Sequence, residues 1–211
     1  TPLYSSAASD VYKRQQVYRE GGHDGLIGLG GGSAIDIAKS VGAYAGYHGA
    51  LEDLFGIDQV PRKGPPLIAI PTTAGTGSEV TNVAILSDRV AQLKKGIISD
   101  YLLPDVALVS PQMTLTCPPR VTAASGVDAL AHAIEAYLSL NASAITDSLA
   151  IGAIKLIVKA LPKAFANPAH LQAREDMATA SLMAGMAFGN AGVGAVPVSY
   201  THLRAHETRE D

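Results

Sequence analysis

The stretch LIGLGGGSAIDIAKSVGAYA, residues 26–45, decides the fold. It begins with an apolar run of strand length, passes through three consecutive glycines, and ends in a segment with apolar residues at helical spacing. We expect the helix to cover Ser33–Ala45 with Ser33 as its N-cap, because a serine hydroxyl accepts a hydrogen bond from the free N–H groups of a first turn. The stretch therefore predicts a strand, a glycine turn and a helix, which make one unit of an α/β layer.

The rest of the chain divides into two halves with different patterns. Leu67–Ile70 and Val106–Val109 are further apolar runs of the length of a buried strand. After Pro118-Pro119 the strand pattern does not return, and three helical stretches are expected at about residues 121–140, 145–166 and 171–189. The sequence predicts an α/β domain followed by an all-α domain, with the boundary near Cys117.

The two ends of the chain do not continue these patterns. Residues 1–15 show no periodicity leading into the next segment, and residues 197–211 follow an Ala/Gly-rich stretch abruptly. Both resemble translated sequencing-adapter tails, and ordinary polar termini are the alternative interpretation. We therefore expect non-native tails at 1–15 and 197–211, the α/β domain at 16–117 and the helical domain at 118–196.

The composition excludes several functional classes. The formal net charge of the 211 residues is -3, so the chain lacks the basic surface that nucleic-acid binding requires. Its apolar runs are too short for a membrane span. Cys117 is the single cysteine, which excludes an intramolecular disulfide and is typical of a reducing compartment. We expect a cytoplasmic protein without nucleic-acid or membrane partners.

The glycine turn, with Gly31, Gly32 and Ser33, is the first candidate site. Residues without a Cβ let the backbone approach a diphosphate, and the start of a helix favours negative charge. Asp36 in the same helix adds a polar group nearby. The spacing differs from the G-x-G-x-x-G of the usual dinucleotide turn, and a purely structural glycine turn is the alternative.

The second candidate site is the loop PTTAGTGSE, residues 71–79, which directly follows a predicted strand. Thr72, Thr73 and Thr76 offer hydroxyl groups to a ribose or a phosphate. Its position at the carboxyl end of a strand favours ligand binding, because α/β sheets bind ligands there. A flexible loop with a helix cap at Thr76 or Ser78 is the alternative.

The third candidate site is the stretch GVDALAHAIE, residues 126–135. Asp128 and His132 are four residues apart, so on a helix they share a face and could chelate one metal ion. Their apolar neighbours favour this reading, because buried polar groups need a partner. A surface hydrogen bond between the two side chains is the alternative.

Taken together, GGGS, PTTAGTGSE and GVDALAHAIEAY, in this order and at these separations, resemble the iron-containing (group III) alcohol dehydrogenase family over residues 16–196. The resemblance implies a nucleotide-binding α/β domain followed by an all-α metal-binding domain, with the active site in the cleft between them. It also implies NAD or NADP as the cofactor. The implied cofactor-binding residues are Gly31, Gly32, Ser33, Asp36, Thr72, Thr73, Thr76 and Lys94.

The resemblance further implies that Asp128 and His132 are the first two ligands of a catalytic divalent metal, Fe²⁺ or alternatively Zn²⁺. In the family two histidines complete the site, and the first follows the segment that ends here at Val196, where this chain has Pro197. The implied reaction is reversible hydride transfer between a small-molecule alcohol and an aldehyde or ketone. We expect the parent protein to be a homo-oligomer and this chain, with two ligands, to be inactive.

Both domains are expected to be incomplete, because the family's first strand and helix and its last helices have no counterpart here. Two alternatives remain open. One is a glycerol dehydrogenase or maleylacetate reductase-like enzyme of the same fold, although PTTAGTGSE and DALAH favour the alcohol branch. The other is a non-catalytic nucleotide-binding relative. The sequence does not decide the alcohol, or between NAD and NADP.

Overall fold

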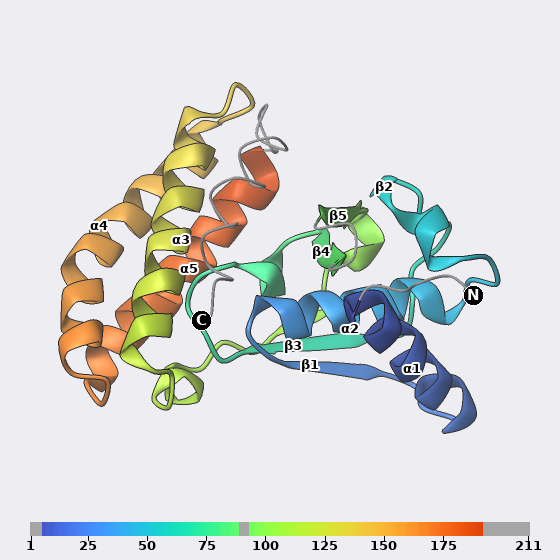
Figure 1. The fold of residues 1–211 in the computed structure, drawn as a ribbon. Helices are drawn as coiled ribbons and strands as arrows, with labels where there is room; N and C mark the ends of the chain where they lie inside the picture. The colour runs from blue at the N-terminus through green and yellow to red at the C-terminus, as the bar shows by residue number, and fades with distance from the viewer. Residues whose placement is uncertain (1–5, 89–92, 192–211) are drawn as a thin grey trace.

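A computed structural model gives the chain a sheet-containing part from its first half and a helical part from its second half (Figure 1). It describes residues 6–88 and 93–191. The order of an α/β part and an all-α part confirms the predicted fold class. The helices are α1 (Ser6–Glu20), α2 (Gly32–Ala45), α3 (Pro119–Leu138), α4 (Ala144–Ala166) and α5 (Leu171–Ala191). The strands are β1 (Leu26–Gly30), β2 (Gly56–Ile57), β3 (Leu67–Pro71), β4 (Val83–Asp88), β5 (Leu93–Ile98) and β6 (Val106–Ala107).

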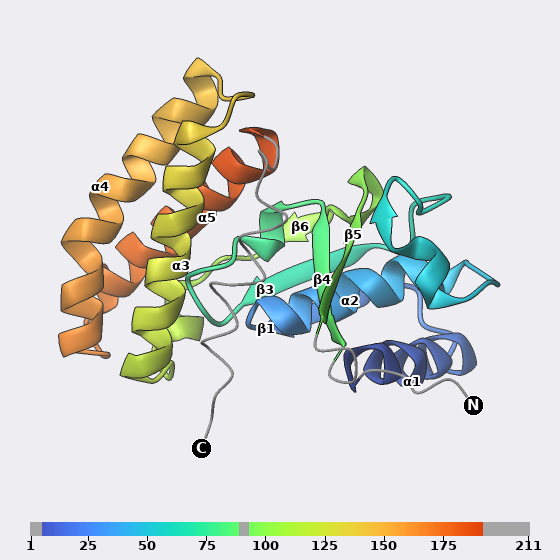
Figure 2. The same cartoon turned by 45° about the horizontal axis from the view of Figure 1, so that its top comes forward.

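Strands β1, β3 and β6 form a parallel sheet in the order β1-β3-β6 (Figure 2). Leu26 pairs with Leu67 and Gly30 pairs with Pro71, so β1 and β3 end at the same level. This register places the turn after β1 beside the loop after β3, at the edge of the sheet where α/β proteins bind ligands. The three strands correspond to the three expected apolar runs.

Helix α2 covers one face of this sheet and comes close to β1. A Cβ at Gly28 would lie 3.1 Å from the Cβ of Ala38, so the glycine lets helix and strand approach each other. The opposite face is open: Ile27 is 66% exposed and Val106 is 47% exposed. The strands, which were expected to be buried, are therefore covered on one face of the sheet and exposed on the other.

A second, mixed sheet in the order β2-β5-β4 is not predicted by the sequence. Strands β4 and β5 pair antiparallel, and β2 joins β5 in parallel. Leu86 and Ile97 of this sheet are buried in one cluster with Val41 of α2, which forms the core of the α/β part. The sequence of β5, LKKGII, interrupts the apolar alternation typical of a half-buried strand with charged residues and a glycine.

Helix α1 packs against α2 and belongs to the α/β part. Val11 is completely buried in its core, and Tyr12 meets the ring of Tyr44 edge-on, with ring centroids 5.3 Å apart. Helix α1 therefore packs against the α/β part, and the boundary expected at residue 16 stays a prediction. The helical pattern of α1 is weak because most of its residues are polar. The tail expected at 197–211 lies outside the described residues.

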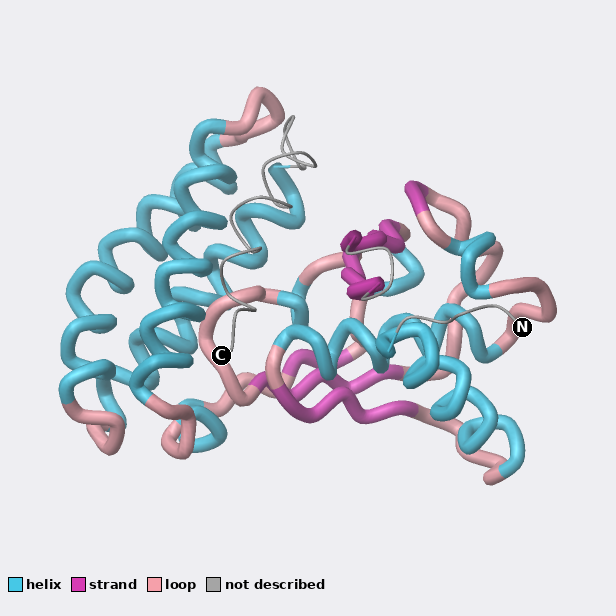
Figure 3. Tube along the Cα trace, viewed as in Figure 1, coloured by secondary structure: helices cyan, strands magenta, loops and turns pink. Residues whose placement is uncertain are grey.

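Helices α3, α4 and α5 pack on one another to form the helical part (Figure 3). Their bounds agree with the expected helices to within two residues. The shared core consists largely of alanines such as Ala129, Ala153 and Ala184, and these small side chains let the helices approach closely. The helices that the structure describes include none that is long and apolar enough to cross a membrane.

Candidate cofactor and metal site

The glycine turn after β1 and the threonine loop after β3 lie side by side. The backbone N–H of Thr72 donates to the last carbonyl of β1 over 2.9 Å, which continues the pairing of β1 with β3. A Cβ at Gly31 would lie 3.5 Å from Oγ1 of Thr73, and one at Gly32 would lie 2.6 Å from Oγ1 of Thr76. The threonine side chains thus occupy the space that a Cβ at each glycine would need. The glycine turn and the threonine loop, which are two of the predicted sites, therefore form one surface.

Helix α2 begins one residue earlier than expected, with Gly31 as its N-cap. No side chain caps this helix, so the prediction that Ser33 is the N-cap is wrong. Ser33 is instead an exposed residue of the first turn. A helix start without a side-chain cap offers its first N–H groups and its dipole to an anion.

Asp36 ties α2 to the threonine loop. Its Oδ1 accepts a hydrogen bond of 2.6 Å from the hydroxyl of Ser78, and its Oδ2 accepts one of 3.1 Å from the N–H of Ile85. Both carboxylate oxygens therefore bind the protein. These hydrogen bonds let Asp36 fix the loop, and its predicted contact with a cofactor stays a prediction.

Lys39 lies one turn further along α2 and is 1% exposed. Its Nζ donates to the carbonyls of Thr81 and Val83 over 2.7 and 2.9 Å. Burial lowers the pKa of Lys39 to about 8, while the nearby charges of Asp36 and Glu79 act in the opposite direction. Burial also raises the pKa of Glu79. Lys39 therefore holds the start of β4 against α2.

Lys94, which the resemblance assigns to the cofactor, lies on β5. It pairs with Ser87 of β4 in the antiparallel ladder, and it is half-buried. The sheet that the sequence did not reveal is therefore the element that positions this predicted cofactor contact.

Asp128 and His132 share one face of α3, as their spacing predicts. Nε2 of His132 lies 3.9 Å from Oδ1 of Asp128, and the two side chains are 4% and 18% exposed. Nδ1 of His132 lies 3.4 Å from the carbonyl oxygen of Gly75. Because a carbonyl only accepts, a neutral His132 bound in this way carries its proton on Nδ1 and turns its Nε2 lone pair toward Asp128. This is the orientation of a metal-binding histidine.

The surroundings of this pair fit a divalent cation. Glu135, in the next turn of α3, has a buried Oε2 that accepts no hydrogen bond from the described residues. Burial raises the pKa of Glu135, and the charge of Asp128 raises it further. Acceptors are thus in excess on this helix face, as a cation requires. Within residues 6–88 and 93–191 no group of three His, Cys, Asp or Glu residues could hold a metal, so the pair is at most a half-site with two candidate ligands.

Two members of this site were not singled out from the sequence. Gly75 contributes a backbone carbonyl, which every residue carries, so no side-chain pattern could reveal it. Glu135 stands at helical spacing from Asp128 and His132, and this spacing was the available signal.

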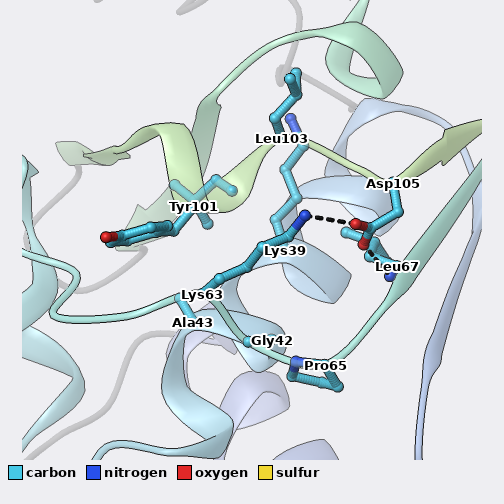
Figure 4. Close-up of a pocket in the computed structure, with 11 residues that line it drawn as sticks. Lys39, Gly42, Ala43, Lys63, Pro65, Leu67, Tyr101, Leu103 and Asp105 are labelled. Carbon is cyan, nitrogen blue, oxygen red and sulfur yellow. Dashed lines mark hydrogen bonds and ion pairs between the residues drawn. The ribbon is translucent and has the colours of Figure 1, made fainter.

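The pocket shown in Figure 4 is separate from this site. It lies before β3 and β6, at the edge of the sheet opposite the glycine turn. Lys63 and Asp105 form an ion pair of 2.5 Å there, and the N–H of Leu67 donates to the other oxygen of Asp105 over 2.9 Å. These hydrogen bonds lower the pKa of Asp105. Lys63 and Asp105 of this pocket thus bind each other, and the third charged residue that lines it, Lys39, binds backbone carbonyls.

Two family models match the chain. The model of iron-containing alcohol dehydrogenases matches residues 6–111, and the model of the C-terminal part of the Fe-containing alcohol dehydrogenase family matches residues 122–206. The first match begins within α1, which agrees with the place of this helix in the α/β part.

Several relatives extend this result. Long-chain-alcohol dehydrogenase 1 of Geobacillus thermodenitrificans (strain NG80-2) is 53% identical over 181 residues, which cover 84% of this chain and 45% of that protein. NAD-dependent methanol dehydrogenase of Bacillus methanolicus is 43% identical over 190 residues, which cover 90% and 50%. The crystal structure of sulfoacetaldehyde reductase from Bifidobacterium kashiwanohense in complex with NAD+ matches with a TM-score of 0.84 and 39% identity, over 90% and 52%. The chain spans about half the length of these relatives. From the two family models and these likenesses, the chain belongs to the iron-containing alcohol dehydrogenase family.

Proposed function

We propose that the chain is part of a metal-dependent, NAD(P)-linked oxidoreductase that transfers a hydride reversibly between an alcohol and an aldehyde or ketone. One observation carries the proposal. The loop after β3 lies against the glycine turn through Thr73 and Thr76, and its Gly75 carbonyl binds His132 of α3. Metal-assisted hydride transfer needs a cofactor and a metal-held substrate side by side, and this loop joins the two candidate sites.

In this proposal the start of α2 holds the diphosphate of the cofactor. Its N–H groups donate to the phosphate oxygens, and the threonine hydroxyls of the neighbouring loop donate to the ribose or the diphosphate. NAD is supported by the names of the methanol dehydrogenase and the sulfoacetaldehyde reductase complex, and NADP is the alternative. The proposed cofactor-binding residues are Gly31, Gly32, Ser33, Thr72, Thr73, Thr76 and Lys94, with Asp36 fixing the loop through Ser78.

Asp128 and His132 would hold the divalent metal, with Fe²⁺ favoured by the family and Zn²⁺ as the alternative. Bound there, the metal supplies a Lewis acid that lowers the cost of forming an alkoxide. The chain itself contributes a carboxylate and an imidazole acceptor from one largely buried helix face. Two ligands do not fix the geometry of a catalytic metal, so we expect the 211-residue chain to bind NADH without oxidising alcohols.

The half-site is also the observation that favours a second candidate, a non-catalytic nucleotide-binding relative. Such a protein would bind NADH and would show no divalent metal binding that depends on His132. A glycerol dehydrogenase or maleylacetate reductase-like enzyme would keep both sites and differ in substrate. The relatives named as alcohol dehydrogenases support the alcohol branch.

The proposed cradle can be tested by placing a negative charge where the diphosphate would bind. Ser33→Glu is suited to this, because Ser33 is exposed and a carboxylate in the first turn of a helix stabilises it. Ser148→Glu introduces the same charge at an exposed position near the start of α4 and serves as the control. We expect Ser33→Glu to weaken NADH binding about tenfold or more through charge repulsion, and Ser148→Glu to leave it unchanged.

Binding is measured by calorimetric titration with NADH and, separately, NADPH. Equal affinities of the two variants would contradict the cradle. Absence of NADH binding in the unmodified chain would contradict its cofactor-binding role, and metal-dependent oxidation of a primary alcohol by the same chain would contradict the expected inactivity. Zn²⁺ titration of the chain and of His132→Ala then distinguishes the two candidates, because only the dehydrogenase is expected to bind Zn²⁺ in a way that depends on His132.

A further inference from the structure

The threonine loop, residues 71–79, lies between the start of α2 and the helical part. It leaves the end of β3, contacts the glycine turn through its threonines, and passes against α3 and α5 before β4 begins (Figure 1). Side chains hold it on the α2 side: Thr76 occupies the space beside Gly32, and the Ser78 hydroxyl donates to Asp36 over 2.6 Å. The helices α3 and α5 hold its other side.

The loop meets these helices through backbone contacts that leave no room for an added side chain. A Cβ at Gly185 of α5 would lie 2.8 Å from the Cα of Gly77 and 3.1 Å from its carbonyl oxygen. A Cβ at Gly75 would lie 2.7 Å from the Cβ of Ser125 on α3 and 2.8 Å from the carbonyl oxygen of that serine. Two carbon atoms in contact need about 3.5 Å or more, so a methyl group at Gly185 or Gly75 must displace the loop from its helix.

A displacement of Gly77 reaches the threonines directly. Thr76 is the residue before it, and a trans peptide holds neighbouring Cα atoms about 3.8 Å apart, so the two residues move together. The Thr76 hydroxyl accepts from the N–H of Ser78 over 3.3 Å, which couples the residue after Gly77 as well. A loop displaced from α5 finds no free space on the α2 side, because Thr76 already lies where a Cβ of Gly32 would be. The contact with α5 therefore decides where the threonine hydroxyls lie.

We propose that Gly185 is a positioning residue for the surface that the glycine turn and the threonine loop form. Because it has no side chain, the loop can lie close to α5 and still leave Thr73 and Thr76 in place beside the glycine turn. Helix α5 carries none of the proposed cofactor-binding residues, so it sets the geometry of this surface without lining it. That the surface holds a cofactor rests on the proposed function, whereas the packing of the loop does not.

The variant Gly185→Ala tests the proposal. Alanine is a better helix residue than glycine, so a loss cannot come from helix propensity and must come from the contacts of the new methyl group with Gly77 and Val80. Gly189→Ala is the matched control on the same helix, because its Cβ would lie no closer than 3.6 Å to the residues packed against it. Gly75→Ala displaces the loop from the α3 side and serves if Gly185→Ala does not fold.

Two measurements are made well below the melting temperature of each variant. Amide hydrogen exchange, followed by mass spectrometry, reports on the packing of the loop without any ligand. Residues 72–80 should exchange about fivefold faster in Gly185→Ala and at the unmodified rate in Gly189→Ala. Calorimetric titration with NADH reports on the surface itself. Its Kd should rise about fivefold in Gly185→Ala, as expected for the loss of one hydrogen bond to a threonine hydroxyl, while the stoichiometry stays that of the unmodified chain.

A folded Gly185→Ala chain in which the loop exchanges at the unmodified rate would overturn the proposal. So would faster exchange of the loop with an unchanged Kd for NADH. A role of Gly185 confined to packing among the three helices predicts a lower melting temperature and faster exchange in α3 and α4, with the loop and the Kd unchanged. Should the unmodified chain bind no NADH while the loop of Gly185→Ala exchanges faster, the cofactor-binding role fails and the positioning of the loop stands. NADH binding that Gly185→Ala does not weaken gives the reverse.

Discussion

A buried charge next to the candidate site shows what one residue contributes. The ammonium group of Lys39 is almost completely removed from water, and the Thr81 and Val83 carbonyls replace part of its hydration. Burial of a charge is costly, and the pKa of Lys39, lowered to about 8, expresses this cost. The same hydrogen bonds hold β4 beside the end of the threonine loop. Burial of Lys39 thus lowers the stability of the folded chain, while its hydrogen bonds fix the position of the loop.

The lowered pKa predicts how stability depends on pH. Between about pH 8 and the ordinary lysine value of 10.5, the unfolded chain keeps the Lys39 proton and the folded chain loses it. The unfolded state then binds more protons, so the free energy of unfolding rises with pH in this window. We expect a rise of roughly 2 kcal/mol from this residue between pH 7.5 and pH 9.5.

Urea unfolding of the chain and of Lys39→Met at both pH values measures this effect. The difference between the two proteins isolates Lys39, because other groups titrate in both. Tyr12, whose pKa burial raises, acts in the opposite direction only above about pH 10. The same pH dependence in Lys39→Met and in the unmodified chain would show that Lys39 is not the cause.

At the scale of elements, the sequence predicted the structures that follow from local patterns, and it missed those that depend on contacts between distant residues. The strand, glycine turn and helix at residues 26–45 have a strong periodic signal, and so do the three helices of the second half. Helix α1 and strand β5 were missed, because polar residues mask their periodicity, whereas the apolar run of β4, VAILSD, was an available signal that was not used. The hydrogen bond between Gly75 and His132 joins residues 57 positions apart and involves a backbone group. This hydrogen bond forms only because α3 and α5 pack on the loop, so no local sequence pattern predicts it.

The start of α4 offers a test at this scale. The Ser143 hydroxyl accepts from the N–H of Thr146 over 3.3 Å, and the Thr146 hydroxyl accepts from the N–H of Ser143 over 2.7 Å. We expect Ser143→Ala to lower the free energy of unfolding by about 1 kcal/mol, because it leaves a first-turn N–H without its acceptor. Ser148→Ala removes an exposed hydroxyl that donates to the carbonyl of Ala144, and water can replace this donor because both residues are exposed, so its urea midpoint should remain within error of the unmodified chain. Equal midpoints of the two variants would show that the cap contributes nothing.

At the scale of the whole molecule, the open face of the β1-β3-β6 sheet is the feature that matters most for association in water. Parallel sheets are normally covered on both faces, and here α2 covers one. Ile27 and Leu29 of β1 are 66% and 54% exposed, and Ile68 of β3 lies beside Ile27 in the ladder. A contiguous apolar surface of this kind promotes association in water.

We therefore expect the isolated chain to self-associate. Size-exclusion chromatography with light scattering should show an average mass that increases with protein concentration. Ile27→Thr should reduce this increase, because it keeps a residue suited to a strand and removes apolar surface from the open face. Leu140→Thr removes a fully exposed side chain from the α3–α4 loop and should change little. A single monomer peak at all concentrations would contradict the expectation.

The packing of Gly77 against Gly185 also has a consequence for the order of synthesis. The ribosome makes the threonine loop with the first half of the chain, whereas the helix that seats it is among the last described segments to emerge. Until then the loop has no backbone to pack against, although the strand before it can already pair. A nascent chain arrested before α5 should therefore expose the loop to protease, and release of the arrest should protect it. In this family member the proposed cofactor cradle gains the backbone that seats it only after α5 has left the ribosome.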